Sequence, residues 1–124
     1  PLPLADPCGS AVRAAQEMIE MLALFNREPD RAGKPPIRIG IGIASGSVIA
    51  GYTGPEQRAT YTCVGDTVNL AARLEAHTKS AGRAILIDGS TRAALGSACA
   101  SEALGPVLFK GKAAAVDIFA LGGA

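Results

Sequence analysis

The chain has 124 residues, the size of one domain, and a chain of this length can bury about two thirds of its surface. Hydrophobic residues make up 48% of the sequence and aromatic residues 4%, so the core is expected to be aliphatic. Twelve Lys and Arg against eleven Asp and Glu give a net charge of +1 without a block of like charge. The charge pattern therefore implies neither a nucleic-acid partner nor an acidic membrane.

The cysteines indicate a reducing compartment. Cys8, Cys63 and Cys99 are far apart, odd in number and without metal-ligand spacing, so no disulfide framework is expected. The sequence has no signal peptide and no apolar run long enough to cross a bilayer. These features predict a soluble, cytoplasmic segment with no membrane contact of its own, although a longer parent protein could be anchored elsewhere.

The first expected element is an amphipathic helix that opens at Asp6 and Pro7 and runs to Asn26. Apolar residues at positions 11, 15, 18, 22 and 25 recur at helical spacing, so this face should lie on a sheet. Met18 and Met21 are interpreted as core filler within this helix.

A strand is expected next, because residues 37–43 alternate with period two. Four isoleucines fall on one face, and Arg38, Gly40 and Gly42 fall on the other. Two glycines beside an arginine allow two interpretations, which are close approach of a ligand or another backbone, and packing beneath a helix.

The glycine-rich segment 44–54 lacks the Lys-Ser/Thr ending of a P-loop and does not match the dinucleotide fingerprint. It is interpreted as a turn followed by a short helical or strand segment, with glycines that permit tight packing. A turn at residues 55–58 and a strand at 59–64 should follow.

Residues 61–75 are the most informative stretch, in which β-prone residues lead through Gly65 into a helix that ends near Ala76. Asp66 is expected to cap this helix by accepting backbone N–H bonds. Asn69 and Arg73 are four residues apart, so they share a helix face about 6 Å from each other at Cβ. An amide beside a guanidinium fork suits a phosphate or a pentacoordinate phosphorus.

The remaining chain is expected to alternate strands with one short helix. A loop at 78–82 precedes a buried strand at 84–88, and Ser90 should cap a helix that ends near Leu95. Two strands follow, near 103–109 and 114–121, joined through the basic turn at Lys110.

Four motifs in this order resemble the class III nucleotidyl cyclase catalytic domain: IRIGI at 37–41, SGSVIAG at 45–51, the stretch 61–75 and FKGK at 109–112. The resemblance covers nearly the whole chain, and GDTVNLAAR at 65–73 is its most specific element. It implies an α+β, ferredoxin-like cyclase fold. Residues 1–124 would be a single partial domain, the C-terminal portion, with the N-terminal strand and the metal hairpin missing.

What the resemblance implies chemically is conversion of a nucleoside triphosphate to a 3′,5′-cyclic nucleotide and pyrophosphate, in sites shared by two antiparallel domains. By motif position, Asn69 orients the ribose and Arg73 stabilises the charge that develops at the α-phosphate. Lys110 contacts the terminal phosphates, and Arg38 of the other protomer holds the phosphate chain.

The base-reading position of the family falls on Thr62, beside the backbone of Cys63. A threonine here resembles the adenylate cyclase subgroup that has threonine where others have aspartate, which favours adenine and therefore ATP and cyclic AMP. Some members of that subgroup respond to bicarbonate, so bicarbonate sensitivity is a hypothesis for the parent protein.

The resemblance also implies two Mg²⁺ or Mn²⁺ ions, whose aspartate ligands would lie in a strand and hairpin before Pro1. Without those carboxylates the fragment alone is expected to be inactive. Loss of the same strands would expose apolar surface and strand edges, so the chain should associate as a homodimer or a swapped oligomer.

Three other functions stay open on the sequence. The chain could be a non-catalytic cyclase-homology module that regulates, although a purely regulatory copy need not retain Asn69, Arg73 and Lys110. It could be a plain α/β dimerisation module in which Arg73 pairs with Glu75 or a neighbouring strand. Within the cyclases, the competing function is guanylate cyclase.

Overall fold

The structure is a computed structural model that describes residues 5–56, 60–97, 99–110 and 112–121, and of these it leaves out the side chains at positions 53 and 60–62. The mixture of helices and strands is the expected α+β fold. The elements are α1 (Pro7–Asn26), η1 (Pro29–Arg31), β1 (Ile41–Ile43), β2 (Ile49–Thr53), β3 (Thr60–Val64), α2 (Asp66–Ala81), β4 (Ile85–Asp88), α3 (Gly89–Leu95), β5 (Ser101–Val107) and β6 (Val116–Leu121).

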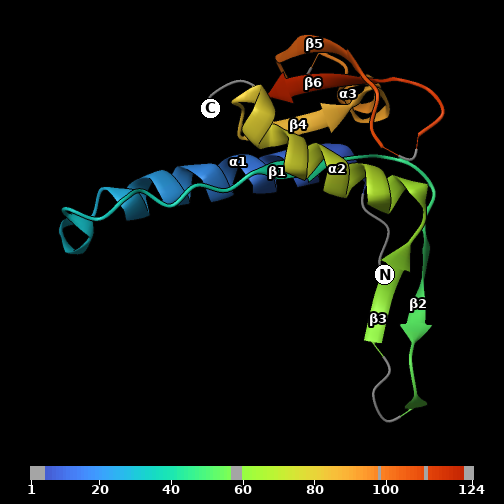
Figure 1. Cartoon of the computed structure of the whole chain (residues 1–124), viewed down its shortest axis with the longest axis horizontal. Coiled ribbons are helices and arrows are strands. Elements are labelled where there is room, and N and C mark those ends of the chain that lie inside the picture. The colour runs from blue at the N-terminus through green and yellow to red at the C-terminus, as the bar shows by residue number, and fades with distance from the viewer. Residues whose placement is uncertain (1–4, 57–59, 98, 111, 122–124) are drawn as a thin grey trace.

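The strands form a four-stranded sheet and a separate two-stranded hairpin. The order in the main sheet is β1-β4-β6-β5, with β1 parallel to β4 and the other neighbours antiparallel. Strands β2 and β3 pair antiparallel with each other and project away from the body as an arm (Figure 1). This arm leads straight into α2, which crosses the main sheet.

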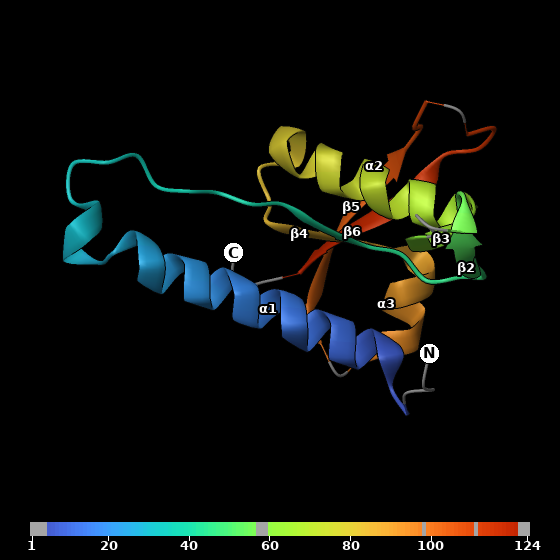
Figure 2. The ribbon, with the colours of Figure 1, turned by 90° about the horizontal axis from the view of Figure 1, so that it is seen from below.

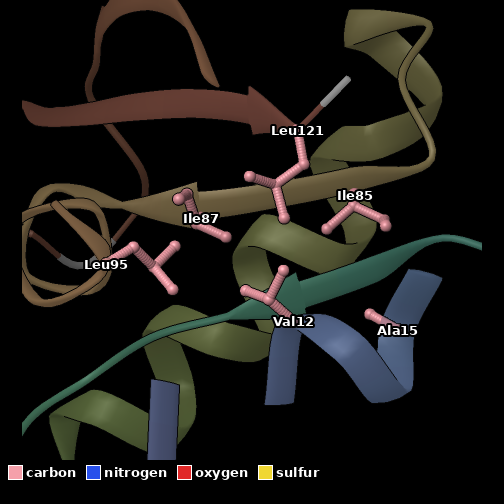
Figure 3. Close-up of a cluster of buried hydrophobic side chains, with 6 residues drawn as sticks. All are labelled: Val12, Ala15, Ile85, Ile87, Leu95 and Leu121. Atoms are coloured by element: carbon pink, nitrogen blue, oxygen red, sulfur yellow. The ribbon is translucent and has the colours of Figure 1, made fainter. Parts of the chain in front are cut away.

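The main sheet lies between two helical layers, with α2 on one face and α1 and α3 on the other (Figure 2). Strand β4 is buried along its whole length and alternates between the two faces. Ile85 and Ile87 pack with Val12 of α1 and Leu95 of α3, in the cluster drawn in Figure 3. Leu86 packs on the opposite face against the α2 cluster. The core is aliphatic, as the composition predicts.

Helix α1 has the predicted bounds but buries a different face. The side chain of Asp6 accepts a hydrogen bond from the backbone N–H of Gly9 at 3.0 Å, which confirms the predicted opening. The buried positions are Gly9, Val12 and Ala15, all in the first half, and the second half extends beyond the sheet (Figure 2). Met18 is 52% exposed and Met21 69% exposed, so their interpretation as core filler is wrong.

The segment that precedes β1 is only partly a strand. Ladder pairing covers Ile41–Ile43, and Ile37 and Ile39 are exposed. The Asn26 side chain makes two hydrogen bonds of 2.9 Å with the backbone of Ile37, one as donor and one as acceptor. A side-chain amide thus takes the place of a strand partner where no strand is paired.

Gly40 and Gly42 decide between the two interpretations left open for this segment. A Cβ added to Gly42 would meet the backbone oxygen of Ala71, and would lie 2.5 Å from the nitrogen of Glu75. A Cβ at Gly40 would collide with the Thr78 hydroxyl. Both glycines therefore allow β1 to pack closely beneath α2.

Helix α2 differs from its prediction at both ends. The N-cap is Gly65, whose φ of 138° favours glycine, and no side chain caps the first turn, so the capping role predicted for Asp66 is wrong. The helix continues to Ala81 and ends at Gly82, which has a left-handed φ of 68°. The predicted loop at 78–82 is therefore helical up to its last residue, because glycine rather than Thr78 stops the helix.

Helix α3 is capped by Asp88 and not by Ser90. The carboxylate of Asp88 accepts hydrogen bonds from the backbone N–H and the hydroxyl of Thr91, at 3.0 and 2.6 Å. The three cysteines, Cys8, Cys63 and Cys99, are free in the structure. Within the described ranges, no helix is long and apolar enough to span a bilayer.

Candidate active site

Asn69 and Arg73 lie one turn apart on α2, as their spacing predicts. Asn69 is exposed and Arg73 is half-buried. Within the described part of the chain, neither side chain has a hydrogen-bond or ion-pair partner. The ion pair found there joins two other residues, Arg83 and Glu102. The pairing of Arg73 with Glu75 that a plain dimerisation module would use is absent. The amide and the guanidinium are left available to a ligand.

The first turn of α2 is held in place by the glycine-rich loop after β1. The hydroxyl of Thr67 donates a hydrogen bond to the backbone oxygen of Ser47 at 3.1 Å. A Cβ added to Gly46 would lie 2.5 Å from that hydroxyl, so the loop backbone touches the helix directly. Leu70 and Leu74, three and seven residues after Thr67 and therefore on the same helix face, anchor α2 in the core. These contacts fix the helix that carries Asn69.

A polar network that the sequence did not reveal supports the same loop. The hydroxyl of Ser45 lies 2.7 Å from that of Thr91, which donates to the buried carboxylate of Asp88. The Cys8 sulfur lies 3.1 Å from the Ser45 hydroxyl and adds α1 to the network. The Asp-x-x-Thr spacing at the start of α3 was the one local signal, because it is typical of a capped helix. The contact with Ser45 spans 46 residues and has no such signal.

Lys110 is placed beside α2 by the residue before it. Phe109 is buried in the α2 cluster, and its ring meets the His77 ring edge-on, with centroids 5.6 Å apart. His77 is the residue one turn beyond Arg73 on α2. The exposed Lys110 thus emerges from the β5–β6 connection next to the helix that carries Asn69 and Arg73.

The position predicted to read the base lies on the hairpin arm. Thr62 pairs with Gly51 and Cys63 with Ala50. Cys63 is exposed, whereas the Thr62 side chain lies outside the described part of the structure. Because β3 runs through Gly65 into α2, the hairpin and the helix that carries Asn69 follow one another directly in the chain.

Arg38 lies apart from the other predicted site residues. It is exposed on the segment before β1, and lines a groove of about 970 Å³ between α1 and the C-terminal half of α2. Glu75 and Lys79 line the same groove, but Asn69, Arg73 and Lys110 do not. Within one chain, Asn69 and Arg73 thus lie on α2, Lys110 follows a residue that packs on this helix, and Arg38 lies elsewhere. The role of Arg38 in a partner's site stays a prediction.

The described residues do not fit a divalent metal ion. Among them, no group of three or more His, Cys, Asp or Glu residues is placed to hold one. The carboxylate of Asp88, which is buried, is already engaged by Thr91. What this part of the chain offers is an amide, a guanidinium and an ammonium group, which are ligands for phosphate oxygens.

The family is given by a match to the model of the adenylate and guanylate cyclase catalytic domain over residues 4–122. The chain belongs to this family. It is 35% identical over 119 residues to adenylate cyclase 1 of Rhizobium meliloti, a match that covers 94% of this chain and 18% of that protein.

Solved cyclase structures share the fold. The guanylyl cyclase Cya2 matches with a TM-score of 0.86 and 32% identity, over 100% of this chain and 62% of that one. The guanylate cyclase domain of RhGC from Catenaria anguillulae, solved with GTP, matches with a TM-score of 0.80 and 31% identity over 98% of this chain and 62% of that one. The chain spans less than a fifth of the length of the first curated relatives that it matches.

Proposed function

We propose that this chain provides one half of an adenylate cyclase site, in which ATP is converted to 3′,5′-cyclic AMP and pyrophosphate for intracellular signalling. The observation that carries the proposal is the face of α2 on which Asn69 and Arg73 have no partner in the described structure, with Lys110 held alongside. A folded domain rarely leaves a half-buried guanidinium unpaired unless a ligand takes it up.

The three side chains have separate tasks in this reaction. The ribose 3′-oxygen attacks the α-phosphorus, its proton passes to solvent, and the bond to the β-phosphate oxygen breaks as pyrophosphate leaves. Asn69 orients the ribose, Arg73 donates to the oxygens that gain charge at the α-phosphorus, and Lys110 neutralises the leaving pyrophosphate. Because Arg73 acts where charge develops, its removal should lower kcat by about 10²- to 10³-fold.

Thr62 supports ATP as the substrate. It occupies the base-reading position on β3, next to the backbone of Cys63. The relatives' names include an adenylate cyclase and guanylyl cyclases, so the family alone leaves the base open. If position 62 reads the base, Thr62→Asp should lower kcat/KM for GTP more than for ATP, because a carboxylate accepts a hydrogen bond from the 6-amino group of adenine and has no donor for the 6-carbonyl oxygen of guanine.

The site is proposed to need two copies of the chain. On the hairpin arm, the side chains of Ile49 and Tyr52 are each 74% exposed and that of Val64 is 49% exposed. Together they form a large exposed apolar surface. A homodimer or a swapped oligomer would cover it and bring Arg38 of the second protomer to the phosphates. A monodisperse monomer in light scattering at assay concentration would contradict this part of the proposal.

The deciding experiment measures cyclic AMP and cyclic GMP formed by the full-length product of the gene, with Mg²⁺ or Mn²⁺ and either ATP or GTP. Arg73→Ala should lose turnover with little change in the KM for ATP, and Arg73→Lys is the matched control that keeps the charge without the fork. A parallel loss of affinity in Arg73→Ala would sink its transition-state role.

The same assay tests two further expectations. Addition of bicarbonate at fixed pH tests whether the parent protein responds to it, and an unchanged rate removes that idea. The 124-residue chain alone should form no cyclic nucleotide, because its described residues hold no metal-ligand group. Measurable cyclic AMP from the purified chain would overturn that expectation.

A non-catalytic cyclase-homology module is the second candidate, and the same lack of a metal-ligand group among the described residues favours it. Such a module would bind ATP without turnover in the full-length protein. Guanylate cyclase remains the alternative within the family, and preferential turnover of GTP would establish it.

A further inference from the structure

Gly51 lies in the middle of β2, and the fold does not require a glycine at this position. Its φ lies outside the region that favours glycine, and a Cβ added there meets nothing within 4 Å. Gly42 and Gly46 differ in this respect, because a Cβ on either would collide with α2. The backbone conformation and the packing at Gly51 would therefore accept a Cβ in the chain as it stands.

Glycine at such a position destabilises the folded chain and makes no packing contact that requires it. It weakens a strand by roughly 0.5–1 kcal/mol relative to alanine, through the entropy of the unfolded chain and the loss of side-chain packing. A strand glycine with open space above it is typical of a site where a ligand or another backbone approaches closely.

The register of the hairpin shows what surrounds this space. Positions 51 and 62 are directly paired, and so lie on the same face of the hairpin. The next pair on that face is Ile49 with Val64, both exposed. The side chains of Ile49 and Val64 therefore form an apolar wall beside the open space above Gly51. Ala50 and Cys63 belong to the opposite face, since successive residues of a strand alternate.

We propose that Gly51 is a specificity-determining position that forms the floor of the base subsite, where the purine ring of the nucleotide lies flat against the strand backbone. The wall of Ile49 and Val64 borders the apolar ring edge, and position 62 reads its polar edge. This inference rests on the proposed function for the identity of the nucleotide.

The proposal makes binding depend on the volume of the side chain at position 51. Alanine should narrow the subsite, and valine should fill it, while the fold tolerates both because the space is open in the free chain. Valine is also a better strand former than glycine, so Gly51→Val should be at least as stable as the wild type. These substitutions should weaken binding of the base and leave binding of the phosphates unchanged.

The test compares ATP with inorganic tripolyphosphate, which has the phosphates but no base. In the full-length gene product, Gly51→Val should raise the KM for ATP by roughly tenfold or more, and Gly51→Ala by less, as expected when buried volume changes by one to three carbons. Inhibition by tripolyphosphate should stay within about twofold of wild type, by the same reasoning. Ala50→Val, on the neighbouring position and the opposite face, is the matched control and should leave both constants unchanged.

Other outcomes separate the possible failures. Equal weakening of ATP and tripolyphosphate, or an unchanged KM for ATP in a folded Gly51→Val, overturns the inference. Weaker self-association of Gly51→Val in light scattering, with normal ATP binding to the dimer that remains, assigns the space to a partner backbone and also overturns it. If the wild type forms no cyclic nucleotide, the proposed function fails, and displacement of a fluorescent ATP analogue then decides the Gly51 inference alone. Absence of both turnover and nucleotide binding overturns both.

Discussion

The close packing of β1 beneath α2 predicts that Gly42→Ala strongly destabilises the protein. The added methyl group would lie 2.5 Å from the backbone nitrogen of Glu75 and 2.8 Å from the Cβ of Leu74, whereas ordinary contact begins at 3.4 Å. The backbone of α2 must therefore retreat by roughly 0.9 Å, the difference between 3.4 and 2.5 Å. A helix held by Leu70 and Leu74 in the core cannot move that far without losing packing.

Overpacking of this kind costs about 1–3 kcal/mol, and a clash with backbone belongs at the upper end, so about 3 kcal/mol is expected. Gly51→Ala is the matched control, because the same added methyl group meets open space. It should be neutral or stabilise by about 0.5 kcal/mol. The two variants should thus differ by roughly 3 kcal/mol in free energy of unfolding, or by about 10 °C in Tm for a domain of this size.

Urea unfolding followed by circular dichroism measures both variants, with the m-value checked to ensure that the denatured states are comparable. Crosspeaks of Asn69 and Arg73 in an amide correlation spectrum should shift in Gly42→Ala and stay in place in Gly51→Ala, since only the first displaces α2. If the two variants unfold within about 0.5 kcal/mol of each other, the packing argument is refuted, because that is the scatter of ordinary surface substitutions.

Three smaller predictions concern single contacts. Asp88→Ala leaves the backbone N–H and hydroxyl of Thr91 without their acceptor, and should cost about 2–3 kcal/mol in urea unfolding, whereas an effect below about 0.5 kcal/mol would contradict the buried cap. Asn26→Ala removes two hydrogen bonds to the segment before β1, so the amide of that segment should exchange with solvent roughly tenfold faster, and unchanged exchange would show that the clamp does not hold it. Arg83→Ala breaks the ion pair with Glu102 at the surface and should change stability by less than about 1 kcal/mol, an effect that 1 M salt should abolish.

Much of the architecture follows from local signals. The Asp6-Pro7 opening and the end at Asn26 define α1, and the continuous apolar run of β4 predicts a strand buried on both faces. The sequence also predicts that Asn69 and Arg73 share one face of α2, because their spacing depends only on helical geometry. These features need no knowledge of distant residues.

The face of α1 could not be predicted in the same way. Apolar residues occur around most of its circumference, so several stripes fit the helical period. Which stripe is buried depends on which face of the helix meets the sheet. Ile19 still packs against the core cluster, whereas Met18 and Met21 lie on other faces of the helix and stay in solvent. A periodic pattern indicates that a face is buried but not what covers it.

Sequence alone determined the chemistry that the candidate site can offer, since one helix carries an amide and a guanidinium at adjacent turns. Tertiary structure decided what surrounds them. The edge contact of Phe109 with His77 brings Lys110 to α2. Close contacts with α2 require glycine at positions 42 and 46, whereas open space surrounds Gly51. The physical reason is that backbone periodicity is local, whereas contact and empty space are set by residues far apart in the chain.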